Sequence, residues 1–266
     1  MNWKTIFRLA LPLVYICSFV LLPLRAYSYV YTDDFKAGHY WQSYPIGMTR
    51  FAVDTSEGAM LEEVTRDAEN SWEAVIGKNI WDLAPVVIST AYSGNSIRWS
   101  DNFGAETGYD PTRTLAVTIR YAQGTYIQKA VIILNGSMPQ LRQNWGGVLS
   151  KTVLHEMGHV IGLDHTSEHA IMAAYISELS TLQSDDISGA NAVVNETLYR
   201  QSTGYVAPVS SSSEKQTSNA LLSSCGTIDS GKGGSGGGPA GFIASLSLGL
   251  MLAMLLKRWK VGQRFF

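Results

Sequence analysis

The stretch HEMGHVIGLDH, residues 155–165, decides both the fold and the chemistry expected of this chain. His155 and His159 are four positions apart, so on a helix both rings lie on one face and can reach the same ion. His165 follows at a spacing that allows it to return to that ion. Three imidazole ligands leave one position on zinc open, which is typical of catalytic rather than structural zinc sites. We therefore predict one zinc centre held by these three histidines.

Two further residues complete the predicted centre. Glu156 is adjacent to the first ligand and is expected to act as a general base toward a water molecule on the metal. Gly162 tolerates a positive φ, so the chain can leave the helix there and bring His165 back. The alternative is an amphipathic helix that carries these side chains by coincidence. The added glycine and third histidine favour the metal site over that alternative.

With this motif the chain resembles the metzincin metalloproteases and, within them, a bacterial type of matrixin catalytic domain. Members of that family place a methionine in a tight turn beneath the metal, and Met172 follows His165 at about that position. They also begin their last helix with a pair of aspartates, which Asp185 and Asp186 match. The residues alone also fit a core methionine and a helix capped by Ser184, with acids at its positive end.

The resemblance implies an α+β fold, a small twisted mixed sheet with about three helices. Hydrophobic periodicity and capping signals are consistent with that order of elements. They predict strands at 48–53, 85–90, 96–99, 113–120 and 130–134, and helices at 56–76 (capped by Ser56), 146–161 and 184–196.

The resemblance also implies how a substrate binds. Leu115, Ala116, Val117 and Thr118 take the place of the edge strand that pairs with an extended peptide, because an exposed edge has unpaired N–H and C=O groups. Tyr175 is assigned to a wall of the specificity pocket, although the proline usual in that wall is absent. The partner implied is therefore a protein or peptide substrate.

The metal content is expected to differ from that of many animal matrixins. Their second, structural zinc is held by histidines around the edge strand, and residues 99–119 contain none. Asp101, Asn102, Glu106 and Asp110 leave a calcium loop possible but unsupported, because their spacing fits no calcium motif. The alternative is a solvated polar loop. One zinc ion is predicted.

The two ends of the chain have the composition of targeting segments. Residues 1–28 resemble a secretory signal peptide, with an uncleaved N-terminal anchor as the alternative. Residues 239–266 combine an apolar segment, long enough to span a membrane, with a basic tail. Together with the preceding glycines they resemble a Gram-negative sorting signal processed by a rhombosortase-like protease; a simple tail anchor is the alternative. We expect a catalytic domain at 29–200 and a Ser/Gly-rich linker without regular structure at 201–238.

Charge and cysteine content narrow the function further. A formal net charge of −2 and the lack of a basic stripe argue against nucleic acid binding. Cys17 lies in the signal, so Cys225 is alone in the mature chain and no internal disulfide is expected. No cysteine precedes the domain in the mature chain, so the thiol that keeps vertebrate relatives latent is absent. The sequence predicts an exported, periplasmic or surface zinc endopeptidase; a non-enzymatic surface module and a zinc hydrolase of a non-peptide bond remain open.

Overall fold

A computed structural model of the chain describes residues 28–144, 147–208 and 221–229. The chain divides into two units, residues 1–231 and 232–266, and the second lies wholly outside the described residues. The predicted signal peptide (except Ser28), the predicted membrane segment at 239–266 and much of the predicted linker also lie outside them. None of the described helices is both long and apolar enough to cross a membrane.

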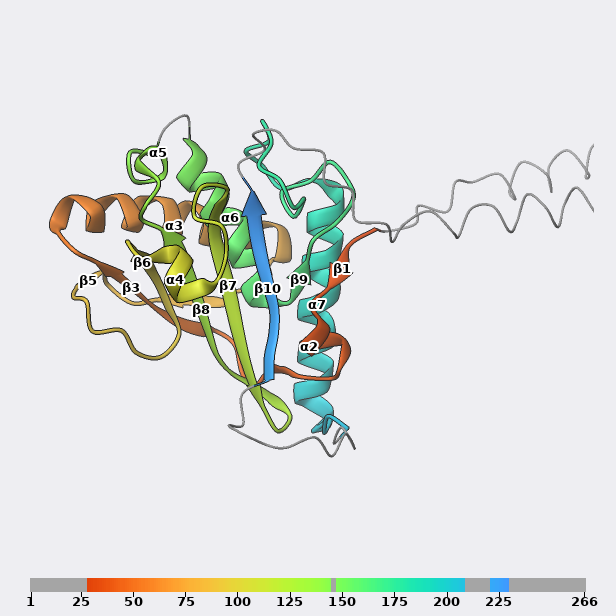
Figure 1. Cartoon of the computed structure of the whole chain (residues 1–266). Helices are drawn as coiled ribbons and strands as arrows, with labels where there is room; N and C mark the ends of the chain where they lie inside the picture. The colour runs from red at the N-terminus through yellow and green to blue at the C-terminus, as the bar shows by residue number, and fades with distance from the viewer. Residues whose placement is uncertain (1–27, 145–146, 209–220, 230–266) are drawn as a thin grey trace, which may run out of the picture. The chain divides into compact units, whose positions relative to one another are not determined.

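The first unit, residues 1–231, contains a mixed sheet with the strand order β10-β7-β8-β6-β3-β4 (Figure 1). The neighbours β8, β6, β3 and β4 run parallel, whereas β7 is antiparallel to β8 and β10 is antiparallel to β7. Two short strands, β2 and β5, pair with β8 and β3. The strands are β2 (Tyr40–Trp41), β3 (Ile46–Ala52), β4 (Trp81–Leu83), β5 (Val87–Ile88), β6 (Ser96–Ser100), β7 (Thr114–Gln123), β8 (Tyr126–Asn135) and β10 (Leu221–Asp229).

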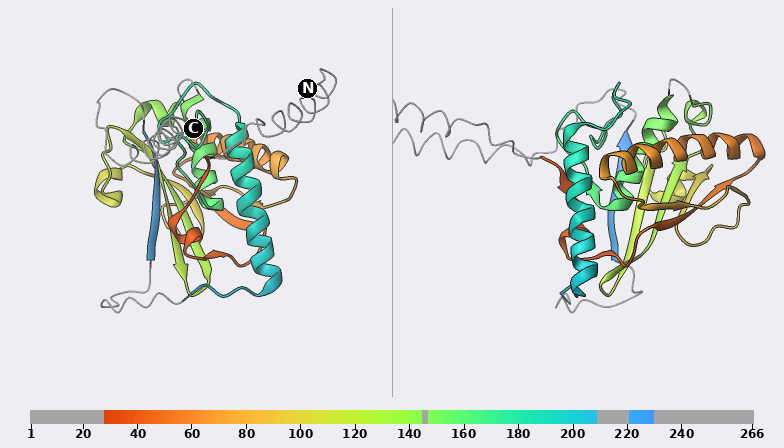
Figure 2. Two further views of the ribbon diagram at one scale, coloured as in Figure 1. Left: turned by 90° about the vertical axis from the view of Figure 1, so that its right-hand side faces the viewer. Right: turned by 180° about the vertical axis from the view of Figure 1, so that it is seen from behind.

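Three long helices accompany the sheet, and the predicted α+β fold is confirmed. Helices α3 and α6 pack against each other on one face of the sheet, and α7 packs against both (Figure 2). A separate pair of short strands, β1 and β9, joins the N-terminal segment to the chain just after α6. The remaining elements are α2 (Asp33–Lys36), α3 (Thr55–Ile76), α4 (Phe103–Thr107), α5 (Pro139–Arg142), α6 (Val148–Ile161), α7 (Ser184–Thr203), β1 (Val30–Tyr31) and β9 (Leu163–Asp164).

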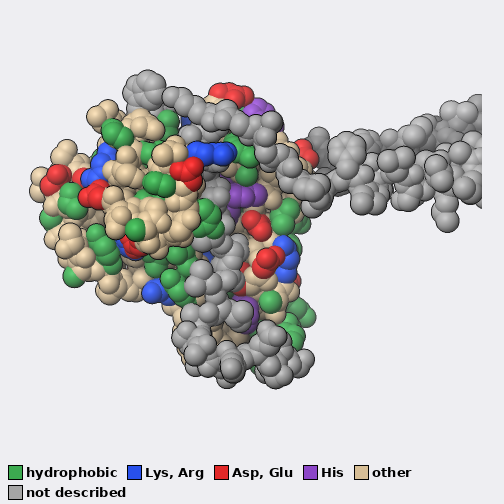
Figure 3. Space-filling view, in the orientation of Figure 1, with side chains coloured by type: hydrophobic (Ala, Val, Ile, Leu, Met, Phe, Trp, Pro, Cys, Tyr) green, Lys and Arg blue, Asp and Glu red, His purple; other side chains and the backbone are tan. Residues whose placement is uncertain are grey.

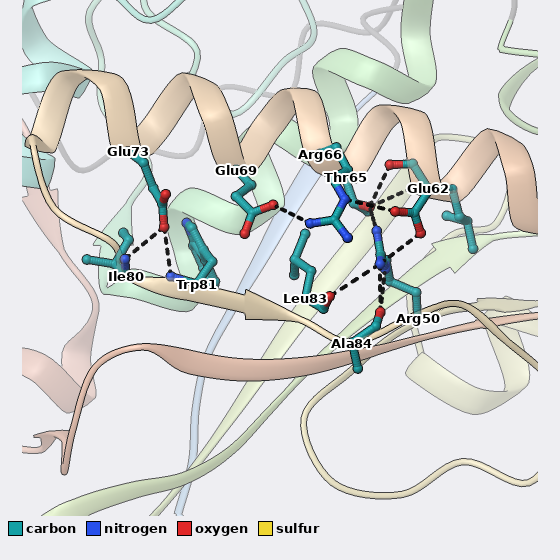
Figure 4. Close-up of polar contacts among 11 residues, drawn as sticks. Arg50, Glu62, Thr65, Arg66, Glu69, Glu73, Ile80, Trp81, Leu83 and Ala84 are labelled. Carbon is teal, nitrogen blue, oxygen red and sulfur yellow. Dashed lines mark hydrogen bonds and ion pairs between the residues drawn. The ribbon is translucent and has the colours of Figure 1, made fainter.

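A buried arginine fixes α3 over the β3–β4 side of the sheet (Figure 4). The Arg50 guanidinium donates to Thr65 Oγ1 and the Ala84 carbonyl, at 2.9 and 2.6 Å, and lies 2.8 Å from a Glu62 carboxylate oxygen. One turn before the end of the helix, Glu73 accepts two consecutive backbone N–H groups at the start of β4. A buried charge with a partner for each guanidinium nitrogen stabilises one placement of the helix.

Two indoles position α6, the helix that carries the zinc motif. Trp72 of α3 donates through Nε1 to the Leu154 carbonyl, and Trp41 of β2 donates to the Val160 carbonyl, both at 2.9 Å. Val160 is in the last helical turn, where carbonyls have no partner within the helix. Each indole thus buries a large apolar surface and fixes the rotation of α6 about its axis.

Some helix and strand boundaries differ from the predicted ones, mostly where two neighbouring polar residues could each cap the same helix. Asp54, not Ser56, caps α3, since its side chain accepts the Glu57 N–H. The strand predicted at 85–90 is reduced to β5, a single pair of residues. Gln183 and Asp186, not Ser184, form the capping box of α7.

The expectation of a linker without regular structure at 201–238 is wrong for the described part. Helix α7 continues to Thr203, and residues 221–229 form β10. The serine- and glycine-rich composition limits only the apolar surface that this segment can bury. Adding a strand to a sheet depends instead on backbone N–H and C=O groups. Without β10, the outer edge of β7 would have such groups unpaired, and residues 221–229 pair with them.

Candidate metal centre

Helix α6 places two imidazoles side by side inside the protein. His155 and His159 are both buried, and their ring centroids are 4.6 Å apart. Their Nε2 atoms face each other at 2.9 Å. This contact follows from the four-residue spacing, which puts successive side chains one turn apart on the same face.

Backbone carbonyls fix which nitrogen of each ring carries the proton. His155 Nδ1 lies 2.7 Å from the Ile171 carbonyl, and His159 Nδ1 lies 2.7 Å from the Leu163 carbonyl. A carbonyl only accepts, so Nδ1 is the protonated nitrogen in both rings. The two Nε2 atoms therefore present lone pairs to the centre, which is the tautomer that metal-ligating histidines need.

Gly162 brings the third histidine to the same point. It ends α6 with φ +123°, a conformation that side-chain-bearing residues rarely adopt. The chain then turns through β9 to His165, whose ring centroid lies 5.3 Å from that of His155 and 4.9 Å from that of His159. One nitrogen from each of the three rings lies within 4.8 Å of the other two. The predicted ligand set thus converges.

The chemistry of this donor set fits zinc. Two neutral Nε2 lone pairs at 2.9 Å cannot hydrogen-bond to each other, and a cation between them would satisfy both. Burial lowers the pKa of His155 to about 3 and that of His159 well below its usual value, so both rings stay neutral ligands. Three neutral imidazoles suit zinc and leave one position for water or substrate.

Glu156 follows the first ligand in α6 and is buried. Its Oε2 accepts the hydroxyl of Thr118 at 2.5 Å, and its Oε1 has no hydrogen-bond partner among the described residues. Burial raises its pKa to about 8, against the opposing effect of the Thr118 hydrogen bond. A nearby dication acts in the opposite sense. One oxygen is thus held in place and the other is available to take a proton.

The predicted methionine turn packs directly beneath the histidines. Met172 is buried, and its sulfur lies against Gly158, where any side chain would collide with it. Asp186 holds the turn, since its carboxylate accepts the N–H groups of Ile171 and Met172, both at 2.9 Å. The Ile171 carbonyl in turn receives the His155 Nδ1–H. A chain of contacts therefore leads from the start of α7 to the first ligand.

The first aspartate of the pair has a different contact. Asp185 Oδ1 accepts the backbone N–H of Ser28 at 3.0 Å, and the Ser28 carbonyl accepts the Thr166 hydroxyl. These two hydrogen bonds attach the N-terminal segment to the start of α7 and to Thr166, the residue after the third histidine. Asp185 and Asp186 were predicted together, but one contacts the N-terminal segment and the other the methionine turn.

The predicted substrate strand is found, but it is not an edge in this structure. Leu115, Ala116, Val117 and Thr118 all lie in β7 and are buried. β7 pairs with β8 on one side and with β10 on the other. The prediction of a free edge is therefore wrong for this conformation, since a later segment of the same chain occupies it.

The remaining predicted positions lie farther out. Tyr175 is 57% exposed. The acids of the possible calcium loop are engaged by the protein: Asp101 pairs with Arg142, Glu106 pairs with Arg98, and Asp110 accepts a hydroxyl and an N–H of its own turn. These contacts do not favour a calcium site.

Sequence reasoning missed a buried ion pair behind the metal centre. Arg120 of β7 lies 3.2 Å from Asp34 of α2, and its Nη1 donates to the hydroxyl of Thr32 at 2.6 Å. The Thr32 hydroxyl in turn donates to the Gly162 carbonyl. The pair links the N-terminal segment to the bend that turns His165 inward. An arginine in the apolar alternation of β7 was the available signal.

Comparison with known proteins agrees with this geometry. No curated protein matches the chain. A model of the matrixin family matches residues 57–194, more than half of the chain's 266 residues. The matched range begins in α3, ends in α7 and contains the three histidines, Glu156, Met172 and both aspartates. The chain therefore belongs to the matrixin family of zinc metallopeptidases.

Proposed function

We propose that this protein is an exported zinc endopeptidase that cleaves protein or peptide substrates with Glu156 as its general base. One observation carries the proposal: nitrogens of two buried imidazoles and one half-buried imidazole converge, with a buried carboxylate next to the first ligand in the sequence, in a chain of a zinc metallopeptidase family. Over the described part of the face in Figure 3, acidic and basic side chains are interspersed. That pattern supports a peptide substrate rather than a nucleic acid.

The chemistry follows from the positions of the side chains. His155, His159 and His165 would hold zinc, which supplies Lewis acidity to a water molecule and to the scissile carbonyl. Glu156 Oε1 takes the proton from the attacking water and passes it to the leaving amide nitrogen. Throughout, the Thr118 hydroxyl holds Oε2, so the carboxylate does not need to reorient during the transfer.

The substrate would be recognised by its backbone before its side chains. β7 runs beside α6, and a strand that pairs with it passes in front of the metal centre. Tyr175 is the candidate side chain for reading the residue next to the cleaved bond. A binding mode of this kind tolerates many sequences, because the main-chain hydrogen bonds supply most of the affinity.

We place this activity outside the cytoplasm on the composition of the two chain ends. The signal-like residues 1–28 and the glycine, apolar and basic segments up to residue 266 support export followed by anchoring or release. Mass spectrometry of the mature C-terminus separates these fates. Cleavage among the glycines indicates a rhombosortase-like processing step, and an intact basic tail indicates permanent anchoring.

The activity is tested on the full chain loaded with zinc. Casein and a peptide library are incubated with the enzyme, with a chelator, and with the chelator followed by added zinc. We expect internal cleavage that the chelator stops and zinc restores. If one equivalent of zinc binds but no peptide is cleaved, the protein is better described as a non-enzymatic surface module. If only esters or other acyl substrates are cleaved, the non-peptide hydrolase is favoured.

A further inference from the structure

The outer side of β7 carries a strand from a distant part of the chain. β10 runs antiparallel to β7, with Leu221 opposite Ala122 at one end and Asp229 opposite Thr114 at the other (Figure 1). In Figure 2, β10 stands at the margin of the sheet, beyond β7. Almost the whole length of the predicted substrate strand is therefore paired by the protein's own backbone.

The same strand passes beside the metal centre. Gly226 is the register partner of Thr118, the residue whose hydroxyl donates to Glu156. β10 also lies close to α6, the helix that carries Glu156 and two of the imidazoles. An extended peptide adding to β7 at this place would need the backbone N–H and C=O groups that β10 uses.

The pairing is built in a way that permits exchange. The register shifts between Ser223 and Gly226 and again between Ile228 and Asp229, so the ladder is interrupted instead of continuous. Interrupted ladders lose hydrogen bonds at the interruption. Because residues 209–220 connect β10 to the domain, the strand nonetheless competes as an intramolecular ligand, for which effective concentrations of about a millimolar are typical of short linkers.

We propose that Leu221–Asp229 is an internal occupant of the substrate edge, which an extended substrate must displace before it reaches the metal centre. The inference rests on the proposed peptidase function and adds a control to it. The open, substrate-competent form is a fraction of the population, and the apparent affinity for substrate is reduced by that fraction. Latency in this chain then comes from backbone pairing.

A kinetic comparison tests the proposal on the full chain. Adjacent residues of a strand point their N–H groups to opposite sides, so replacing both Thr227→Pro and Ile228→Pro removes a donor to β7 wherever the register places it. The matched control carries Ser211→Pro and Ser212→Pro, before β10. We expect the β10 variant to show a KM lower by about tenfold or more, with kcat unchanged, and the control to match the parent.

A second measurement tests the pairing between β10 and β7 without depending on enzyme activity. In a Glu156→Ala background, hydrogen exchange of the β7 amides 114–123 is compared between the parent chain and the two proline variants. Faster exchange, by about tenfold or more, only in the β10 variant supports the occupant. Equal exchange in all three, or equal KM in active enzymes, overturns the proposal. If no variant cleaves peptides while exchange changes as expected, the peptidase function fails and the pairing stands.

Discussion

The metal face of α6 and the outer edge of β7 lie side by side but are specified in opposite ways. Around the metal, each position depends on a particular residue type: an imidazole, a glycine with positive φ, a carboxylate that accepts three backbone N–H groups. Along β7, the pairing with β10 depends on backbone groups that nearly every residue possesses. A site fixed by side chains is specific and rigid, whereas an edge fixed by backbone accepts alternative strands.

The largest effect is expected at the general base. Glu156→Ala removes the proposed proton acceptor, and we expect peptide hydrolysis to fall by about 10²–10⁴-fold while one zinc remains bound. The measurements are kcat/KM and zinc content by mass spectrometry. Because the substitution does not touch backbone pairing, exchange protection along β7 should be unchanged. An active Glu156→Ala enzyme would refute the assignment of the base.

The next effect concerns the carboxylate beneath the metal. Asp186→Asn replaces one acceptor oxygen with a donor that faces backbone N–H groups, so we expect a loss of about 2–3 kcal/mol in unfolding free energy and weaker zinc binding. The matched variant is Asp185→Asn, whose carboxylate accepts a single N–H, from Ser28. Urea denaturation of both checks this. Equal losses in the two variants would show that the methionine turn does not depend on Asp186.

Acid should weaken the metal-free protein in particular. Unfolded histidines protonate near 6.5, whereas folded His155 stays neutral until its pKa of about 3. Between these values the unfolded state binds more protons, so the stability of the folded state falls as the pH falls through this window. Urea midpoints of the metal-free chain at about pH 7.5 and about pH 5 measure this effect. A His155→Gln variant should show a smaller difference, and a midpoint that is independent of pH in the parent would contradict the prediction.

A steric contact connects the ligand helix to the methionine turn. In Gly158→Ala the new methyl group would overlap the Met172 sulfur and approach Trp72, so we expect a loss of about 1–3 kcal/mol from overpacking. Combining it with Met172→Ala should cost less than the sum of the two single changes, because the smaller side chain makes room. Thermal unfolding of the four proteins gives the coupling. If the losses in unfolding free energy are strictly additive, the two residues are not in steric conflict.

The smallest effect is expected where the two regions meet. Thr118 belongs to β7 by its backbone and to the metal centre by its hydroxyl. Thr118→Val keeps the shape but removes the hydrogen bond to Glu156, so we expect kcat to fall by about three- to tenfold at similar KM. Thr118→Ser should retain most of kcat. A normal kcat in the valine variant would show that Thr118 serves the strand alone.

Much of the metal centre could be predicted from sequence because its information is local. The spacing of His155 and His159 becomes geometry as soon as a helix forms, and Gly162 marks the bend by its tolerance of positive φ. The main strands and all three long helices could also be read from periodicity. Asp186 was predicted by resemblance, but its two N–H partners fourteen and fifteen residues away could not be, since they depend on how α7 docks.

By itself the sequence determined the cluster of three histidines, the fold class and the family, since these depend on residue types at fixed spacings. Only the tertiary structure decided what lies along β7. Hydrogen bonds between strands carry no side-chain signature, so a serine-rich segment with the composition of a linker gave no sign that residues 221–229 would pair there. The Arg120–Asp34 pair was hidden for the same reason, because its partners are 86 positions apart and meet only when the N-terminal segment folds back.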